Sequence, residues 1–179
     1  MTIKTSYHRL GTVFVVGIVL ALAVVATGAA RTSPIVAPLL QDAEVYAIKE
    51  AGLQFSIPKG WKVEKQDNGN VVLSFEDGKA SVTFVIEDNY ADVVTGMKSG
   101  LKEKLTDLKA DGDAKQDTHN GMTHIEETGS GTMEGVKITW SIDVLKATKN
   151  VTILTFGVDK VITAHVDDYV KFVDSIKKI

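Results

Sequence analysis

The sequence predicts an α+β domain: a mainly antiparallel sheet of about six to seven strands with two helices packed on its faces, after an N-terminal hydrophobic helix. Short segments with alternating apolar residues follow one another through turn sequences, and such tight connections favour antiparallel pairing. Two segments, 90–109 and 163–179, instead repeat apolar residues at the spacing of a helix. A separate uncharged apolar run near the N-terminus fits neither pattern.

This apolar run covers residues 10–30 and follows Lys4 and Arg9. It is long enough to cross a hydrocarbon core of about 30 Å as a helix, and it also has the features of a signal peptide. Its length favours an uncleaved anchor, although composition leaves open whether residues 1–30 are an anchor or a cleaved signal peptide. Because basic residues precede the run, everything after Arg31 is expected outside the cytoplasm.

Two further parts follow the hydrophobic segment. Residues 31–43 read as an exposed linker, because they contain two of the three prolines and no clear hydrophobic period. Residues 44–179 are predicted to form one domain. The chain has no cysteine, so this domain must fold without disulfides, and no lipid can be attached at a cysteine after the leader.

The first half of the domain contains two predicted strand pairs. Residues 44–57 form two short strands, and Pro58 ends the second because proline cannot donate to a sheet ladder. Residues 70–87 alternate on both sides of Asp77 and Gly78, a preferred hairpin turn. This hairpin is the clearest local signal in the chain.

A helix is then predicted from Tyr90 to about Lys109, ending before Gly112, with Asn89 and Asp92 in a capping arrangement. Three strands are expected after it, separated by turn sequences that contain glycine or asparagine. In this scheme, the segment just after the helix is a turn that carries acidic side chains.

The last two strands and the closing helix have distinct patterns. Residues 136–144 alternate strictly, which predicts one buried and one solvated face. Residues 151–158 are apolar on both faces, so this strand is expected in the centre of the sheet, covered on both sides. Four residues of the closing helix are expected to share its apolar face: Val166, Val170, Val173 and Ile176.

A short motif, "FSIPKGW", connects the second strand with the rest of the domain. Pro58 fixes its own backbone angle, Gly60 tolerates a positive φ, and Trp61 is expected to turn inward and cover one end of the core. Together with the order of the elements, Phe55, Pro58, Gly60 and Trp61 resemble the PsbP-like family. That family includes the extrinsic subunit of plant photosystem II, the Ran-binding Mog proteins and small bacterial envelope proteins. The resemblance implies a structural part for the four residues and an extracytoplasmic location, but no particular partner.

The charge of the chain argues against some classes of partner. The full chain has a net charge of −3, and without Lys4 and Arg9 of the leader its 20 basic residues become 18, against 23 acidic ones, a net charge of −5. No arginine follows Arg31, so the forked guanidinium contact to phosphate is absent. The sequence therefore predicts no nucleic-acid binding and a poor fit to anionic lipid surfaces.

The histidines give no metal signal. His119 and His124 are five residues apart, which places them on opposite faces of an extended chain, and no cysteine or HExxH spacing accompanies them. Replacing His119, His124 and His165 together with Gln is therefore expected to leave the fold intact.

Other motifs also fail the tests for catalysis or ligand binding. Residues 128–135, rich in glycine, lack the Gly-Lys-Ser/Thr of a phosphate loop and are read as a flexible hairpin tip or bulge, and Ser130 within them is no nucleophile elbow. Residues 109–117 lack the ligand pattern of a calcium loop. Glu126 and Glu127 are adjacent, so they point to opposite faces of a strand and cannot work as an acid and base pair.

These observations predict a protein that is not an enzyme, with no catalytic, cofactor-binding or metal-ligating residues and no cofactor. We expect a non-catalytic extracytoplasmic envelope module, periplasmic or at the outer face of the cytoplasmic membrane, with a protein-interaction or accessory role. The alternative is a carrier of a small apolar ligand, held in a pocket between the sheet and the helix of residues 90–109. The expected partner is an envelope protein or that ligand, and the membrane itself is contacted through residues 10–30 if the leader is uncleaved.

Overall fold

The computed structural model describes residues 44–179, so the expected hydrophobic segment and linker lie outside the described residues. Eleven strands and three α-helices make up this part of the chain. In chain order the elements are β1 (Glu44–Ile48), the 3-10 turn η1 (Lys49–Ala51), β2 (Leu53–Ile57), β3 (Lys62–Lys65), β4 (Val71–Phe75), the 3-10 turn η2 (Glu76–Gly78), β5 (Ala80–Ile86), α1 (Tyr90–Lys104), β6 (Thr106–Ala110), β7 (Lys115–His119), β8 (Met122–Met133), β9 (Val136–Lys146), β10 (Asn150–Val158), α2 (Asp159–Ala164), α3 (Val166–Ser175) and β11 (Lys177–Lys178). Among residues 44–179, no helix has the length and apolar composition needed to cross a bilayer.

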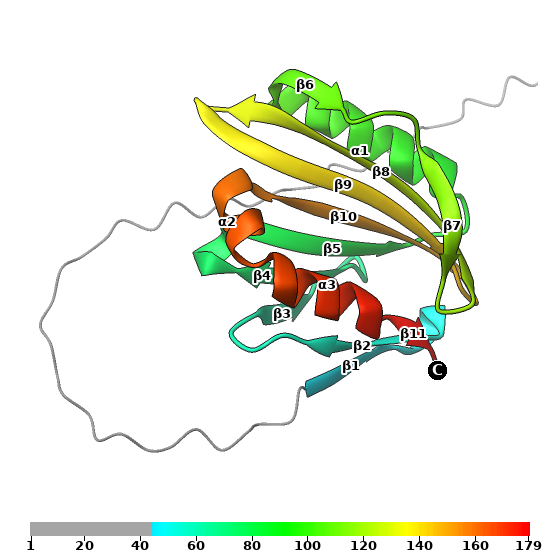
Figure 1. Cartoon of the computed structure of the whole chain (residues 1–179). Helices are drawn as coiled ribbons and strands as arrows, with labels where there is room; N and C mark the ends of the chain where they lie inside the picture. Colours follow the sequence, from blue (N-terminus) through cyan, green and yellow to red (C-terminus); the bar gives the residue numbers. More distant parts are fainter. Residues whose placement is uncertain (1–43) are drawn as a thin grey trace, which may run out of the picture.

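An eight-stranded sheet forms the centre of the domain (Figure 1). Its order is β3-β4-β5-β10-β9-β8-β6, and β7 also pairs with β8. The pairs are antiparallel, as the short connections predict. β10 lies between β5 and β9 and is buried along nearly its whole length, which confirms the central position expected for residues 151–158.

A smaller sheet of order β1-β2-β11 lies below the large one in the view of Figure 1. Its inward side chains, those of α3 and those of β4, β5 and β10 form one hydrophobic core. Phe172 of α3 is at the centre of this core, because its ring contacts Phe55 of β2, Phe84 of β5 and Trp61. The small sheet and α3 therefore cover one face of the large sheet together.

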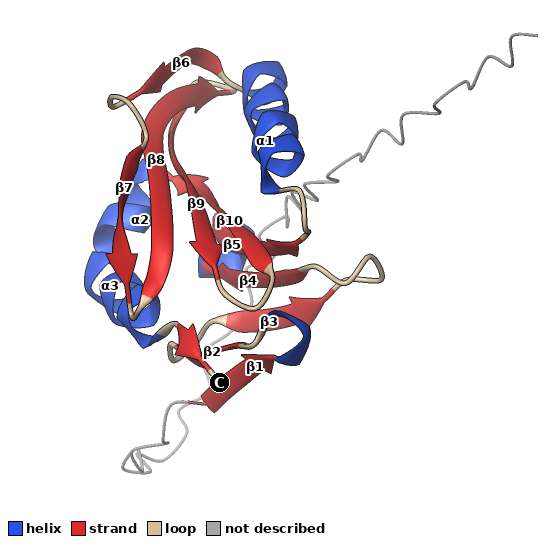
Figure 2. Cartoon of the chain, turned by 90° about the vertical axis from the view of Figure 1, so that its right-hand side faces the viewer, coloured by secondary structure: helices blue, strands red, loops and turns tan. Residues whose placement is uncertain are grey.

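The opposite face of the large sheet is covered by α1 (Figure 2). Met97 and Leu101 on the buried side of α1 pack against apolar side chains of β9 and β10, including Trp140 and Phe156. The fold class predicted from the sequence, a mainly antiparallel sheet with helices on its faces, is confirmed.

The segment after α1 differs from its prediction. The helix ends at Lys104 instead of about Lys109, and residues Thr106–Ala110 and Lys115–His119 form strands β6 and β7. Both strands pair with β8, which is 12 residues long. They supply hydrogen-bond partners for the backbone N–H and C=O groups along the edge of β8 that β9 does not occupy. Pairing with a distant strand thus overrides the helical spacing of the leucines.

The closing helix also differs. It is divided at His165 into α2 and α3, and Val166 and Val170 are 48% and 50% exposed. Ile176 is buried and Val173 packs against the core, as predicted, and Phe172 and Tyr169 join them on this face. The prediction is therefore confirmed for the second half of the apolar face, Val173 and Ile176, and is wrong for Val166 and Val170.

Gly129 and Gly131 lie within strand β8, whereas Glu134 and Gly135 form the hairpin tip that follows it. A Cβ atom at Gly129 would collide with the Lys109 carbonyl oxygen of β6 and with the ring of Trp140. The hairpin tip predicted within residues 128–135 is therefore limited to Glu134 and Gly135, whereas at Gly129 close packing leaves no space for a side chain.

Candidate functional site

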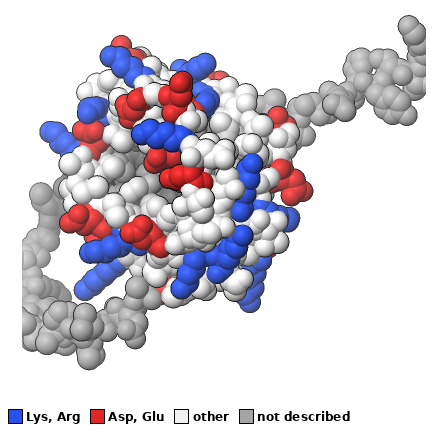
Figure 3. Space-filling view, turned by 45° about the vertical axis from the view of Figure 1, so that its right-hand side comes forward, with Lys and Arg blue, Asp and Glu red and all other residues white. Residues whose placement is uncertain are grey.

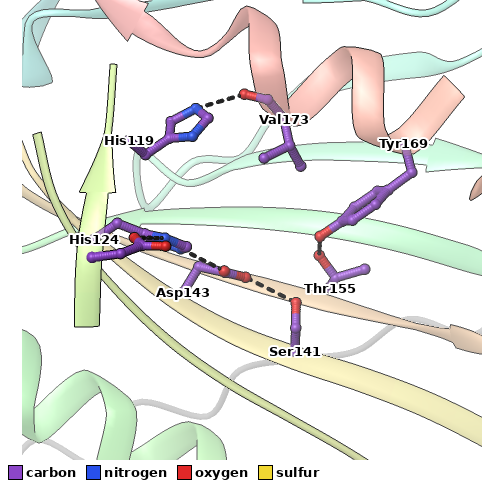
Figure 4. Close-up of polar contacts among 8 residues, drawn as sticks. His119, His124, Ser141, Asp143, Thr155, Tyr169 and Val173 are labelled. Atoms are coloured by element: carbon purple, nitrogen blue, oxygen red, sulfur yellow. Dashed lines mark hydrogen bonds and ion pairs between the residues drawn. The ribbon is translucent and has the colours of Figure 1, made fainter. Parts of the chain in front are cut away.

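A group of polar side chains lies on the face of the large sheet that α3 covers (Figure 4). Ser141 and Asp143 alternate along β9 with the apolar residues of its other face. The sequence predicted that this polar face is solvated. Instead, Ser141 is only 9% exposed and Asp143 is half-buried, because α3 lies nearby and Tyr169 projects from it toward these strands.

His124 of β8 is held between two carboxylates from its neighbouring strands. Its Nδ1 is 2.9 Å from Asp117 Oδ1 on β7, and its Nε2 is 2.9 Å from Asp143 Oδ1 on β9. The Ser141 hydroxyl donates a hydrogen bond to the second oxygen of Asp143 at 2.8 Å. These contacts tie three adjacent strands together through side chains.

The two carboxylates stabilise the charged imidazolium and raise the pKa of His124 from 6.5 to about 9. The hydrogen bond that His124 donates to Asp143 is the largest cause, and partial burial opposes it. The ring therefore carries its proton, and both nitrogens donate, throughout the neutral pH range.

The two histidines of this region lie on the same face, which corrects the prediction of opposite faces. Asn120 and Gly121 turn the chain between them, so His119 ends β7 and His124 lies on β8 across the hairpin. Their rings are 6.0 Å apart, and His119 Nε2 donates to the Val173 carbonyl oxygen of α3 at 2.9 Å. The hairpin reverses the direction of the chain, so the alternation of an extended strand does not apply.

Tyr169 links α3 to the same face. Its hydroxyl is 2.9 Å from Thr155 Oγ1 of β10. Burial raises the pKa of Tyr169 to about 12, and the charge of Asp143 adds to the effect. Tyr169 is therefore a neutral hydrogen-bonding group in this position.

We call these residues the polar cluster: Asp117, His119, His124, Ser141, Asp143, Thr155 and Tyr169. The space that it shares with neighbouring apolar side chains measures only about 20 Å³, room for at most one water molecule. The Ser141 hydroxyl donates to a carboxylate and not to a histidine, so the serine–histidine contact that commonly activates a nucleophile is not formed here. Among residues 44–179, no group of three or more His, Asp or Glu side chains is arranged to hold a metal ion.

A larger hollow of about 430 Å³ lies beside the small sheet and the end of α3. It opens to solvent, and apolar and polar groups share its wall. Its lining residues are Val45, Gln54, Phe55, Ser56, Asn120, Asp174, Ser175 and Lys177.

Two of these residues build the wall. Ser175 Oγ accepts the Ser56 N–H at 2.9 Å, where β11 is too short to continue the pairing of β2. Asn120 Nδ2 donates to the carbonyl oxygens of Asp174 and Ile176 and so closes the end of α3. Hydrogen bonds between segments far apart in the sequence therefore build the wall of the hollow.

Other polar groups of the hollow remain available to a ligand or partner. The side chains of Gln54, Asp174 and Lys177 make no hydrogen bond or ion pair with another residue of the described part. Val45 is 60% exposed and adds an apolar wall. No sequence pattern predicts this site, because its residues come from three segments that are far apart in the chain.

The tryptophans and the paired glutamates lie as the sequence predicts. Trp61 is 8% exposed and stacks on Phe75 at 4.1 Å, and Trp140 is 3% exposed, so both are core residues. Glu127 forms an ion pair with Lys98 of α1, whereas Glu126 is on the opposite face of β8, in register with Asp143.

Comparison with solved structures gives the fold of the chain. The solution structure of cyanobacterial PsbP (CyanoP) from Synechocystis sp. PCC 6803 matches 82% of this chain and 98% of its own, with a TM-score of 0.57 and 11% sequence identity. The chain has the PsbP-like fold. At this identity the PsbP-like match concerns the fold alone.

Two other structures match the PsbP-like domain more loosely. A Pseudomonas aeruginosa protein of unknown function, PA94, described as a putative regulator, has a TM-score of 0.47 at 14% identity, over 75% of this chain and 96% of its own. LpqN of Mycobacterium tuberculosis, described as involved in cell envelope biogenesis, has a TM-score of 0.42 at 14% identity, over 77% of this chain and 86% of its own. No protein-family model and no curated protein matches the sequence.

Proposed function

We propose that the protein is a non-catalytic accessory module of the cell envelope, and that the hollow beside the small sheet binds a side chain of a partner protein. The hydrophobic segment 10–30, preceded by Lys4 and Arg9, supports a position outside the cytoplasm. The PsbP-like fold fits an extrinsic, accessory role. The polar cluster leaves no room for a substrate, and its serine contacts a carboxylate where a serine hydrolase has a histidine.

The observation that carries the proposal is the set of free polar groups around an open hollow. Gln54, Asp174 and Lys177 present an amide, a carboxylate and an ammonium group within one concave surface that also contains the exposed Val45. Interfaces combine such an apolar surface with polar groups that fix orientation. The free groups fit a protein side chain that both packs and forms hydrogen bonds.

The carrier alternative finds less support. Neither the hollow nor the small space at the polar cluster adjoins α1. Between α1 and the sheet, Met97, Leu101, Trp140 and Phe156 pack against one another as core. An apolar ligand would therefore have to displace buried side chains there.

The test uses in-cell crosslinking of the full-length protein in its own envelope, followed by purification and mass spectrometry. We expect one partner to be recovered with the parent and lost with Ser56→Trp, which fills the hollow. Ser99→Trp, on the exposed surface of α1, is the matched control and should retain the partner. Recovery of the partner with Ser56→Trp would refute the assignment of the hollow, and a stoichiometric apolar ligand with no partner would favour the carrier.

A further inference from the structure

Exposed lysines gather at one end of the domain, although the chain as a whole is acidic. Figure 3 shows lysine side chains along the lower rim of the molecule, with acidic side chains mostly above them. We call this region the lysine end, and its lysines are Lys49 of η1, Lys65 of β3, Lys149 of the β9–β10 turn, and Lys177 and Lys178 of β11.

Backbone contacts bring these segments together around Gly52. The Thr148 N–H donates to the Ala51 carbonyl oxygen at 3.3 Å, which fixes the turn that carries Lys149. The Ile179 N–H donates to the Gly52 carbonyl oxygen at 3.0 Å, which fixes β11 beside β2. Backbone hydrogen bonds therefore fix the positions of the segments that carry these lysines.

The charges at this end are only partly balanced. Lys65 is 3.9 Å from Glu50, an exposed and therefore weak ion pair. Lys49, Lys177 and Lys178 form no ion pair within the described residues. Three acidic residues lie at the same end: Glu50 in η1, and Glu87 and Asp88, whose backbones hydrogen-bond to Asn150 next to Lys149. The five lysines exceed these three, so this end is positive although the chain as a whole is acidic.

The position of the lysine end relative to the start of the domain suggests its partner. β1 begins at Glu44 and runs five residues within the small sheet, about 15 Å, before reaching Lys49. The 13 residues 31–43 are long enough to span at most about 45 Å. A membrane that holds residues 10–30 is therefore within reach of the lysine end.

We propose that the lysine end rests on anionic phospholipid headgroups of that membrane and so orients the domain at its surface. This inference rests on the proposed position at the outer face of a membrane, with the leader uncleaved. Lysines close to an anionic leaflet gain favourable electrostatic energy that falls off within a Debye length. In this orientation β6 and the end of α1, at the opposite end of the molecule in Figure 1, point away from the bilayer.

The experiment reconstitutes the full chain into vesicles of phosphatidylcholine, with and without about one third phosphatidylglycerol. Acetylation rates of individual lysines are then followed by mass spectrometry. We expect Lys49, Lys177 and Lys178 to react severalfold more slowly on the anionic vesicles, and high salt to remove the difference. Lys102 and Lys104 at the end of α1 should react equally on both vesicles.

Matched variants separate docking from anchoring. Lys49→Gln with Lys149→Gln should abolish the protection of Lys177, whereas Lys102→Gln with Lys104→Gln should preserve it. Flotation of the vesicles shows whether the chain is anchored. Equal lysine acetylation rates on both kinds of vesicle, measured for a chain that floats with both, would overturn the docking alone. A chain that floats with neither would overturn the docking together with the proposed anchoring. Protection that requires an added envelope protein would assign the lysine end to that protein instead.

Discussion

The contacts of His124 make the stability of the domain sensitive to alkaline pH. The pKa of His124 rises from 6.5 to about 9 in the folded protein, a difference that corresponds to about 3 kcal/mol of folding free energy. This is an upper value, because the Asp117 side chain is 70% exposed and its contribution is screened. Asp143, with a side chain only 14% exposed, supplies most of the effect.

The folded-state pKa is raised, so the stabilisation is complete below pH 6.5 and is lost as the pH rises toward about 9. We expect the free energy of unfolding of the parent to fall across this window by about 2–3 kcal/mol more than that of His124→Gln. Urea unfolding followed by the fluorescence of Trp61 and Trp140 measures this difference, and an NMR titration of the ring measures the pKa directly. The expectation from the sequence, that replacing the histidines is harmless, is therefore revised for His124.

Substitution of the two carboxylates provides the internal check. Asp143→Asn should lower the pKa of His124 more than Asp117→Asn does, because the hydrogen bond to Asp143 is the largest cause of the shift. His165→Gln, whose ring contacts Glu76 elsewhere, is the control for replacing a histidine as such. A ring that titrates near pH 6.5, or a variant with the same pH dependence as the parent, would refute the reasoning.

Three further substitutions test the packing of the domain. Trp61→Ala should lower the free energy of unfolding by about 3–5 kcal/mol, measured by thermal or urea unfolding, because it removes a buried ring. A variant that is as stable as the parent but loses its partner would assign Trp61 to binding. Gly129→Ala should destabilise the domain by at least about 1–3 kcal/mol, since its Cβ has no space, whereas Gly96→Ala in open space on α1 should be neutral or stabilising. Tyr169→Phe should cost about 1 kcal/mol in the same assay through the lost hydrogen bond to Thr155, and a larger loss would indicate a wider network.

The sequence alone determined the elements whose signals are local. The turn at Asp77 and Gly78, the strand end at Pro58 and the inward position of Trp61 depend on backbone angles and neighbouring residues. The central position of residues 151–158 follows from apolar side chains on both faces. These features can be predicted from the sequence because they depend on the alternation of apolar residues and on turn residues within a few positions of each other.

The tertiary structure decided what depends on distant partners. The length and free edge of β8 convert Thr106–Ala110 into a strand, and the β7–β8 hairpin brings His119 and His124 to one face. The hollow combines residues from β1, β2, the β7–β8 turn and the end of α3.

Charge is the clearest case of this division. The sequence determined the sum, a net charge of −3, and the exclusion of arginine-based phosphate recognition. It did not determine where the charges lie, because Lys49, Lys149 and Lys177 become neighbours only when their segments converge on Gly52. Coulomb interactions depend on distance in space, so an acidic chain can still fold with a basic end.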